Sequence, residues 1–341
     1  MVTDAPAPLP AQARLRDVAQ AAGVSLATAS KALNGKNEVN ASTRQRVQEA
    51  ADRLGFVPNT LVQAMLQGRS GTVGLITNDL DGRFAMPILM GAEDAFGAGK
   101  MSVFLCDARE DAIREQYHLT ALLGRRVDGI IVVGSNTDQR PPLAARIPIP
   151  VVYAYAPSTD PGDAAVIVDE RRGGAMAVEH LIATGRRRIA HISGDVSYTA
   201  ARDRAAGALA ACEDAGLTMV GPVRYGTWTE AWGRAATPAV LADRADAILC
   251  GSDQIARGVL DALRDASVSV PDQVAVASFD NWEPMIAGTR PSLTSMDMQL
   301  GLIGKRAAER LFEILSGTET HSGIEKLIPR LVVRGSTVAG A

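Results

Sequence analysis

The residues whose types and spacing could do chemistry fall into two groups. The first is the run 25–34, in which hydroxyl, amide and ammonium side chains share a short stretch with small apolar ones. Hydroxyls and amides can hydrogen-bond phosphate and sugar oxygens, and a lysine can donate to a base edge. The second group combines arginine, aspartate and aromatic side chains later in the chain. The arginine and aspartate side chains can form paired hydrogen bonds with the hydroxyls of a polyol, and the aromatic rings can stack on its apolar face.

Common motifs of catalysis are absent from the sequence. It contains no G-x-G-x-x-G, no P-loop, no G-x-S-x-G and no clustered His, Cys and Asp residues, so no nucleophile–base pair can be nominated. The three cysteines, Cys106, Cys212 and Cys250, lie far apart without metal-ligand spacing, which indicates reduced, buried thiols. We therefore expect no enzyme, no cofactor and no metal site.

The elements that must position the first group are three short helices. Helical spacing begins at Leu15 and ends at Gly23, and a second apolar stripe, capped by Ser25, ends at Asn34. Asn40 can cap a third helix, which Gly55 and the following proline terminate. Two helices about a tight turn, covered by a third, predict a helix-turn-helix module.

The second group lies in a region with a different pattern of apolar residues. Residues 58–70 predict a conditional helix or linker, too short for a stable isolated helix. Beyond it, apolar β-rich runs alternate with helical stretches, a pattern typical of parallel sheets covered on both faces. The runs are VGLIT, MSVFLC, DGIIVV, PVVYAY, AAVIV, RIAHIS, DAILC and QVAVASF. The fold class is α/β, and we expect eight to ten strands divided between two similar lobes.

Composition limits the class of protein. The chain of 341 residues is 47% hydrophobic and 21% charged, as expected for a soluble globular protein. Its net charge is −3, yet residues 11–70 hold eight basic against four acidic side chains, an excess of +4. Only this N-terminal part is thus expected to contact a polyanion. With no apolar run approaching membrane-spanning length and no apolar leader at its start, the chain is expected in the cytoplasm, without a membrane partner.

The run LRDVAQAAGVSLATASKALNGKNEVNASTRQRVQEAADRLGFVPN resembles the headpiece of the lactose-repressor/galactose-repressor family of bacterial transcription regulators. Later segments, among them ARDRAAGALAACEDAG and DAILCGSDQIARGVLDAL, are similar to that family's effector-binding body in order and spacing. The resemblance covers residues 14 to about 335. It implies a DNA-binding domain over 12–57, a hinge over 58–70 and a two-lobed, periplasmic-binding-protein-like domain for effector binding and dimerisation over 71–341.

For DNA reading, the resemblance points to the second helix, which lies in the major groove in this motif. Leu26, Ala27 and Lys31 match its base-reading positions, although Lys31 stands where the family more often has arginine and so lacks the bidentate fork. Met65 matches the hinge position that wedges an apolar side chain between central base pairs, and ordinary packing of the hinge helices is the alternative. Phosphate or sugar contacts are expected from Ser25, Thr28, Ser30 and Asn34, with Ser25 also open to interpretation as a simple helix cap. Asn59 is expected among the DNA-binding residues.

For effector binding, the resemblance implies that Arg204 and Asp280 contact the ligand, with Trp228 and Phe84 stacking on it. Alternatives are that Arg204 pairs with an acidic neighbour on a solvated helix face and that Trp228 belongs to the core. Further candidates are Ser252 and Asp253, which replace a common Asn-Asp pair, and residues at strand-to-helix junctions, where α/β sheets bind ligands. The junction residues are Asp79, Asp169 and Arg172.

The resemblance implies an allosteric repressor that binds double-stranded operator DNA as a homodimer or a higher oligomer. An effector in the cleft, a sugar or a related metabolite, would alter operator affinity by favouring one state of lobe closure. A solute-binding protein of a transport system shares the two-lobed body, but it would need an export signal and no headpiece. An enzyme on the same sheets has no catalytic motif to support it.

Overall fold

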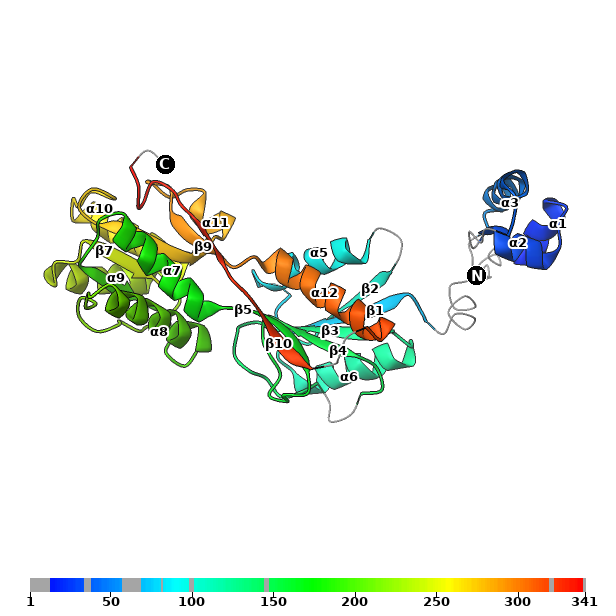
Figure 1. Cartoon of the computed structure of the whole chain (residues 1–341), viewed down its shortest axis with the longest axis horizontal. Coiled ribbons are helices and arrows are strands. Elements are labelled where there is room, and N and C mark those ends of the chain that lie inside the picture. The colour runs from blue at the N-terminus through cyan, green and yellow to red at the C-terminus, as the bar shows by residue number, and fades with distance from the viewer. Residues whose placement is uncertain are drawn as a thin grey trace, which may run out of the picture. The chain divides into compact units, whose positions relative to one another are not determined.

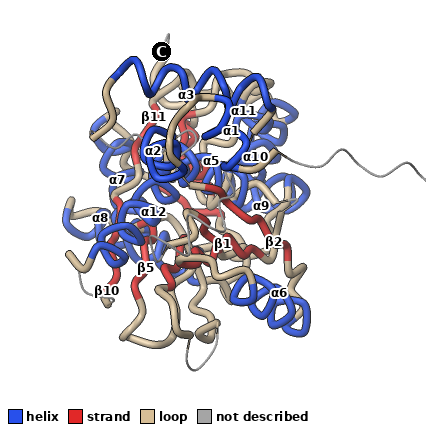
Figure 2. The backbone as a smooth tube through the Cα atoms, turned by 90° about the vertical axis from the view of Figure 1, so that its right-hand side faces the viewer, coloured by secondary structure: helices blue, strands red, loops and turns tan. Residues whose placement is uncertain are grey.

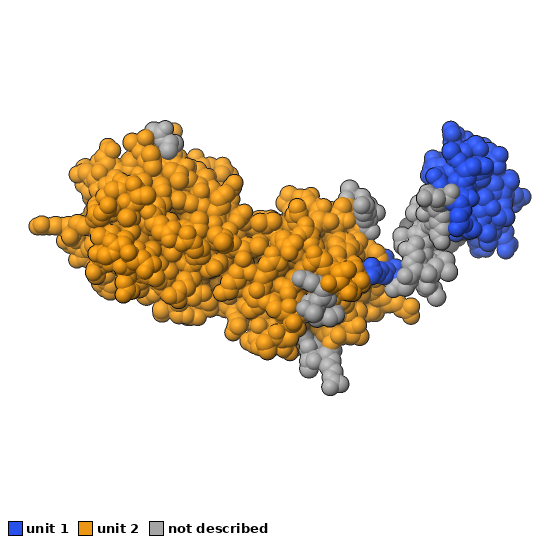
Figure 3. Space-filling model, viewed as in Figure 1, with its two compact units in different colours: residues 1–70 blue, residues 71–341 orange. Residues whose placement is uncertain are grey.

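A computed structural model describes residues 13–33, 38–56, 69–80, 82–97, 101–143, 147–318 and 322–339. The chain divides into two compact units, residues 1–70 and 71–341, which are blue and orange in Figure 3. The expected Asn34, Asn59 and Met65 contacts, and most of the expected hinge, lie outside the described residues.

The first unit contains three helices, α1 (Leu15–Ala21), α2 (Leu26–Leu33) and α3 (Ala41–Leu54). They enclose a small core in which the side chains of Val18, Ala29 and Val47 are fully buried. This confirms the predicted helix-turn-helix module with its covering third helix.

Local signals set the ends of these helices. Gly23 has a φ of +65° in the turn between α1 and α2, a conformation that glycine adopts without strain. Ser25 Oγ accepts a hydrogen bond from the Thr28 amide at 3.1 Å, and Asn40 Oδ1 accepts one from the Thr43 amide at 2.8 Å. Both predicted N-caps are therefore present.

The second unit begins with a lobe built on a six-stranded parallel sheet in the order β10-β5-β4-β3-β1-β2. Its strands are β1 (Thr72–Thr77), β2 (Ser102–Asp107), β3 (Gly129–Val133), β4 (Val151–Ala154), β5 (Ala164–Val168) and β10 (Gly323–Leu327). The helices of this lobe are α5 (Ala85–Phe96), α6 (Ala112–Gly124) and α12 (Leu300–Ser316).

Alternate residues of these strands face opposite helix layers. Ile131 and Val133 belong to the core beneath α5 and α12, whereas Ile130 and Val132 belong to the core beneath α6. Figures 1 and 2 both show α6 on the other side of the sheet from α5 and α12. Burial on both faces explains why these strands are almost uniformly apolar.

The second lobe has a five-stranded sheet in the order β11-β9-β8-β7-β6, parallel except for its edge pair β9 and β11. Its strands are β6 (Ile189–Ile192), β7 (Ala247–Cys250), β8 (Ala275–Asp280), β9 (Thr294–Asp297) and β11 (Arg330–Val332). Its helices are α7 (Glu170–Ala183), α8 (Thr199–Asp214), α9 (Glu230–Ala242), α10 (Asp253–Asp265) and the short α11 (Glu283–Ile286).

The chain passes between the lobes three times, at residues 168–170, 297–300 and 327–330. These crossings are hydrogen-bonded to one another: the Asp169 amide donates to Leu327 O at 2.8 Å, and Gln299 Nε2 donates to Ile328 O at 2.6 Å. The crossings form the connection that can act as a hinge between the lobes. The orange unit narrows there in Figure 3.

All eight apolar runs expected as strands form strands, and the division into two lobes is confirmed. Three further strands, β9, β10 and β11, were not predicted, because they are short and carry polar residues. None of the helices in the described part of the chain combines the length and the apolar character that crossing a bilayer requires.

Candidate functional site

The first unit presents one face of α2 to solvent. Leu26 is 51% exposed, and Ala27 and Lys31 are also exposed. Ala29 and Ala32, on the opposite side of the helix, are buried against α1 and α3. An apolar side chain as exposed as Leu26 at the start of a short helix is positioned for contact with another molecule.

Polar groups at the start of α2 are partly engaged within the unit. Ser25 caps the helix, and its hydroxyl lies 2.8 Å from the Thr28 hydroxyl. The Lys31 ammonium forms an ion pair with the Glu38 carboxylate, and both side chains are about half exposed or more. Ser30 is half-buried on the same helix. The exposed face thus carries one cation whose charge is partly offset by an acidic neighbour.

In the second unit, a cavity of about 380 Å³ lies between the two lobes. Its walls come from segments that follow the carboxyl ends of strands, where open α/β sheets bind ligands. The first lobe contributes Asp79, Arg83, Phe84, Asn136 and Tyr155, and the second contributes Tyr198, Arg204, Trp228, Gln254, Asp280 and Trp282. Five of the nine residues predicted for effector contact line it: Asp79, Phe84, Arg204, Trp228 and Asp280.

Arg204 is held by a buried ion pair. Its Nε and Nη2 donate to Glu170 Oε2 and Oε1 at 2.6 and 2.8 Å, and its Nη1 donates to Gly251 O at 2.6 Å. Burial opposes the charge, but Glu170 more than offsets it and raises the pKa of Arg204. The expected alternative of a pair on a solvated helix face is wrong, because the side chain of Arg204 is 3% exposed.

Asp280 ends β8 and lies at the floor of the cavity with its side chain 4% exposed. Its Oδ2 is 2.9 Å from Arg83 Nη2, and its Oδ1 is 3.7 Å from Arg204 Nη1. Within the described residues, neither oxygen accepts a hydrogen bond of good geometry. A buried carboxylate in this state favours a ligand that donates hydrogen bonds.

Aromatic rings line both sides of the cavity. Phe84 stacks on Tyr155 with ring centroids 4.9 Å apart, and Tyr198 meets the edge of Trp228 at 5.9 Å. The backbone makes room for Trp228 at Gly194, where a Cβ would lie 2.2 Å from the indole ring. These rings offer apolar surfaces on which the flat face of a sugar or a base can stack.

Ser252 and Asp253, predicted as effector contacts, lie outside the cavity lining and are fully buried. Ser252 caps α10 through a hydrogen bond from the Ile255 amide. Asp253 accepts hydrogen bonds from the Ser278 and Ser295 hydroxyls and from the Trp282 amide, at 2.5, 2.7 and 2.7 Å. Burial and the nearby Asp280 raise the pKa of Asp253 to about 7 despite these bonds. Both residues organise the floor of the site rather than face it.

Asp169 and Arg172 also lie outside the cavity lining. Asp169 caps α7 by accepting a hydrogen bond from the Arg172 amide at 2.9 Å. The Arg172 guanidinium pairs with Glu179 on the exposed side of the same helix, at 2.5 and 3.1 Å. The structure therefore places Asp169 at a helix N-cap and Arg172 in a surface ion pair, away from the cavity.

Several residues of the cavity were missed by sequence reasoning. Arg83 and Trp282 each lie within two residues of a predicted site residue, Phe84 and Asp280, so proximity along the chain was an available signal. Tyr155 directly follows β4, at the edge of the sheet that the strand rule already identifies. Glu170 adjoins the predicted residue Asp169 but does not line the cavity, and its role comes from Arg204, 34 residues away along the chain.

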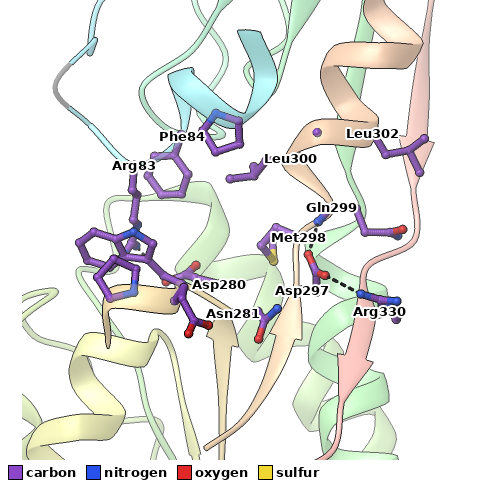
Figure 4. Close-up of a pocket in the computed structure, with 15 residues that line it drawn as sticks. Arg83, Phe84, Asp280, Asn281, Asp297, Met298, Gln299, Leu300, Leu302 and Arg330 are labelled. Carbon is purple, nitrogen blue, oxygen red and sulfur yellow. Dashed lines mark hydrogen bonds and ion pairs between the residues drawn. The ribbon is translucent and has the colours of Figure 1, made fainter. Parts of the chain in front are cut away.

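A second cavity, of about 560 Å³, extends from Arg83 and Asp280 toward the crossings between the lobes. In Figure 4, Asp297 lies between Gln299 and Arg330, which contact it from two sides. The Gln299 amide donates to Asp297 Oδ1 at 2.8 Å, and Arg330 Nη2 lies 3.0 Å from Asp297 Oδ2. No cluster of three or more His, Cys, Asp or Glu side chains suited to a metal ion occurs in the described ranges.

Comparison with family models places two known domains on the chain. Residues 14–59 match the model described as "Bacterial regulatory proteins, lacI family", and residues 178–337 match the periplasmic binding protein-like domain. The first covers the three-helix unit, and the second covers most of the second lobe and the C-terminal crossings. A headpiece of this family disfavours the transport-protein alternative.

Relatives match over nearly the whole chain. The chain is 31% identical to catabolite control protein A of Priestia megaterium over 330 residues, which is 94% of this chain and 98% of the relative. It is 26% identical to the transcriptional repressor PurR of Mannheimia succiniciproducens, over 95% of this chain and 98% of the relative. These relatives are transcriptional regulators rather than enzymes.

Solved structures agree with this assignment. The lac repressor dimer bound to operator and the anti-inducer ONPF matches with a TM-score of 0.77 and 26% identity, over 96% of this chain and all of that one. The complex of the transcriptional regulator CelR with cellobiose matches with a TM-score of 0.65 and 29% identity, over 95% of this chain and all of that one. The chain therefore belongs to the LacI family of bacterial transcriptional regulators, with a DNA-binding domain and an effector-binding domain.

Proposed function

We propose that this regulator is a repressor that binds a pseudopalindromic operator as a homodimer and changes its operator affinity when a hydroxyl-rich metabolite, a sugar, occupies the cleft between the lobes. The observation that carries this proposal is the presence, on one chain, of an exposed reading face on α2 and a cleft with a buried carboxylate among aromatic rings. Because its partner is DNA, its place of action is the cytoplasm.

On the DNA side, Leu26 and Ala27 would contact thymine methyl groups, and Lys31 would donate to a guanine edge. The exposure of all three side chains supports these roles. Ser25, Thr28 and Ser30, at the start of α2, would position the helix on phosphates. The proposal extends to Asn34, Asn59 and Met65 from family resemblance alone.

On the effector side, Asp280 would accept hydrogen bonds from two ligand hydroxyls, and Asn136 and Gln254 would add amide contacts. Phe84 and Trp228 would cover the apolar faces of the ligand. Arg204, whose donors are engaged by Glu170 and Gly251, would mainly position this floor and supply positive charge. Asp79 is half-buried at the rim, where it can accept a further hydroxyl.

Dimer formation is supported by an exposed apolar strip on the first lobe. Met86 and Met90, one turn apart on α5, are 43% and 60% exposed, and Leu105 on the edge strand β2 is 37% exposed. Unpaired edge strands and apolar helix faces are usually covered in stable assemblies. The similar lac repressor structure is a dimer on its operator.

The test is a fluorescence anisotropy titration of the full chain with duplex DNA from its own promoter region, against a scrambled duplex of equal length. We expect tight binding to the promoter duplex and a loss of about 1–3 kcal/mol for Leu26→Ala or Lys31→Ala. Gln48→Ala, an exposed substitution on α3, is the matched control and leaves binding unchanged. Equal affinity for both duplexes would overturn the proposal.

A thermal-shift screen of neutral sugars, sugar phosphates and nucleosides then tests the effector class. A ligand that binds the native state raises the unfolding temperature, and the rise increases with ligand concentration relative to the Kd. The same compound must change the anisotropy titration in the wild type and lose its effect in Asp280→Asn. A nucleoside as the active compound would contradict the sugar assignment while leaving the regulator assignment intact.

A further inference from the structure

Arg83 and Asp280 connect the two lobes across the cleft. Arg83 precedes α5 in the first lobe, and Asp280 ends β8 in the second. Arg83 Nη2 lies 2.9 Å from Asp280 Oδ2, and the two side chains are 15% and 4% exposed. Figure 4 shows Arg83 extending from the segment before α5 toward the strand end that carries Asp280. We call this contact the Arg83–Asp280 latch.

Rings from both lobes flank the Arg83 guanidinium. Its central carbon is 4.7 Å from the ring centroid of Phe84, in the first lobe, and 5.2 Å from that of Trp282, in the second. A planar guanidinium can stack on aromatic faces while its edge binds a carboxylate. Three contacts therefore hold one side chain, and two of them reach the opposite lobe.

The latch uses the carboxylate that a ligand would need. Arg204, the other cation near Asp280, directs its own hydrogen bonds to Glu170 and Gly251 and stays 3.7 Å from Asp280. Arg83 is therefore the nearest counter-charge of Asp280 among the described residues. A molecule that donates hydrogen bonds to Asp280 Oδ2 therefore competes with the guanidinium of Arg83 for that carboxylate.

We propose that Arg83 is a built-in competitor for the effector site: it occupies Asp280 in the effector-free protein, holds the lobes together, and is displaced when an effector donates its hydroxyls to that carboxylate. Arg83 is thus a positioning residue that sets both the selectivity of the cleft and its closure. Ligands with two adjacent hydroxyl donors can replace the guanidinium at Asp280, whereas ligands that offer only acceptors cannot.

The displacement step rests on the proposed function, but the latch itself can be tested without effector or DNA. Spin labels on Ile113→Cys in the first lobe and Leu209→Cys in the second, 82% and 45% exposed, report the distance between the lobes in the full chain. Cys106→Ser removes the partly accessible native thiol, since Cys212 and Cys250 are buried. Dilution with unlabelled protein avoids distances between partner subunits.

In this background, Arg83→Ala should reduce the ratio of the closed to the open population about tenfold, as expected for one partly buried ion pair reinforced by ring stacking. Closure is not abolished, because the Thr199 amide of the second lobe also donates to Asp138 of the first, at 2.6 Å. Arg83→Lys keeps the positive charge but lacks the planar guanidinium. Its closed population should therefore lie between those of Arg83→Ala and the wild type. Arg234→Ala, which breaks an ion pair between α9 and α10 within one lobe, is the matched control.

Chemical rescue separates a latch from a general loss of structure. Guanidinium ion at a sub-denaturing concentration should restore the closed population of Arg83→Ala and should not restore that of Asp280→Asn. The double variant should open no further than Arg83→Ala alone, because Arg83→Ala already removes both the ion pair with Asp280 and the contact with Trp282. A distance distribution of Arg83→Ala that superimposes on that of the wild type, or additive effects in the double variant, would overturn the latch even if operator binding behaves as proposed.

Discussion

Arg204 and Glu170 form a two-point ion pair inside the second lobe, with Nε 2.6 Å from Oε2 and Nη2 2.8 Å from Oε1. The pair joins α8 to α7, two helices that pack closely because Gly207 lies against the Arg171 carbonyl, where a Cβ would be 1.8 Å from the oxygen. Arg204 is thereby fixed beneath the cleft, and Asp280 lies within 3.7 Å of it.

Removing the buried carboxylate of Glu170 should lower the free energy of unfolding. Glu170→Gln removes the nearer counter-charge of the buried Arg204 guanidinium and leaves only Asp280, at 3.7 Å; breaking a buried pair costs about 3–5 kcal/mol. Chemical denaturation followed by circular dichroism measures the loss. Glu179→Gln, which removes the exposed partner of Arg172, is the control and should change the free energy of unfolding by less than about 0.5 kcal/mol. Equal effects of the two substitutions would contradict a special role for the buried pair.

Gly194 should be required for the position of Trp228. In Gly194→Ala the new methyl group would lie 2.2 Å from the indole, so the ring must shift, at a cost of about 1–3 kcal/mol. Tryptophan fluorescence should report a changed environment, and any effector found by thermal shift should bind more weakly. Gly124→Ala is the matched control, since a Cβ at that position would have no neighbouring atom within 4 Å. That substitution should be neutral or slightly stabilising.

Local signals in the sequence were sufficient to predict the reading module and most strands. Ser25 and Asn40 cap helices with their own side chains, and Gly23 adopts its turn conformation without distant partners. The apolar strands are equally local, because burial on both faces removes the need for polar positions. By contrast, β10 pairs with β5 through Gly323 and Ala164, and only the three-dimensional arrangement of the crossings brings these residues together.

The position of the cleft could be predicted from the sequence, but the role of each side chain near it could not. A residue at or after the end of a strand can line the cavity, as Asp280 does, or cap the next helix, as Ser252 and Asp169 do. Sequence pattern does not distinguish these outcomes, because serine and aspartate suit both. Arg83 was missed for a related reason: its importance comes from Asp280, a partner on the other lobe.

His191 should make the stability of the protein sensitive to acid. Burial, reinforced by the positive charge of Arg204, lowers the pKa of His191 to about 3, and its ring nitrogens have no hydrogen-bond partner within the described residues. The native state therefore keeps His191 neutral, while the unfolded chain binds a proton below about pH 6.5. Its contribution to stability is present above that pH and is lost as the pH falls toward 3.

The variant His191→Leu isolates this contribution. Between about pH 7 and pH 5, the wild type should lose about 2 kcal/mol of unfolding free energy relative to the variant. Urea denaturation of both proteins across this range gives the difference directly, and other titrating groups cancel in it. At about pH 8, where the imidazole is neutral in both states, any remaining difference reflects packing and the burial of the two unpaired ring nitrogens. Parallel pH profiles for the two proteins would contradict a buried neutral His191.

The Lys31–Glu38 ion pair should weaken DNA binding. Contact with a guanine edge or a phosphate requires the ammonium to exchange its carboxylate partner for DNA, and Glu38 adds a negative charge close to the polyanion. Glu38→Gln should therefore tighten binding to promoter DNA about two- to tenfold at low salt, with a smaller gain as salt screens the interaction. Glu49→Gln removes the same charge from α3, where Glu49 contacts Gln45 instead of Lys31, and is the matched control.

In Lys31→Ala the substitution of Glu38 should have a smaller effect, because the interaction that it releases is already gone. Identical gains from Glu38→Gln and Glu49→Gln would indicate that net charge alone, and not the release of Lys31, governs the affinity.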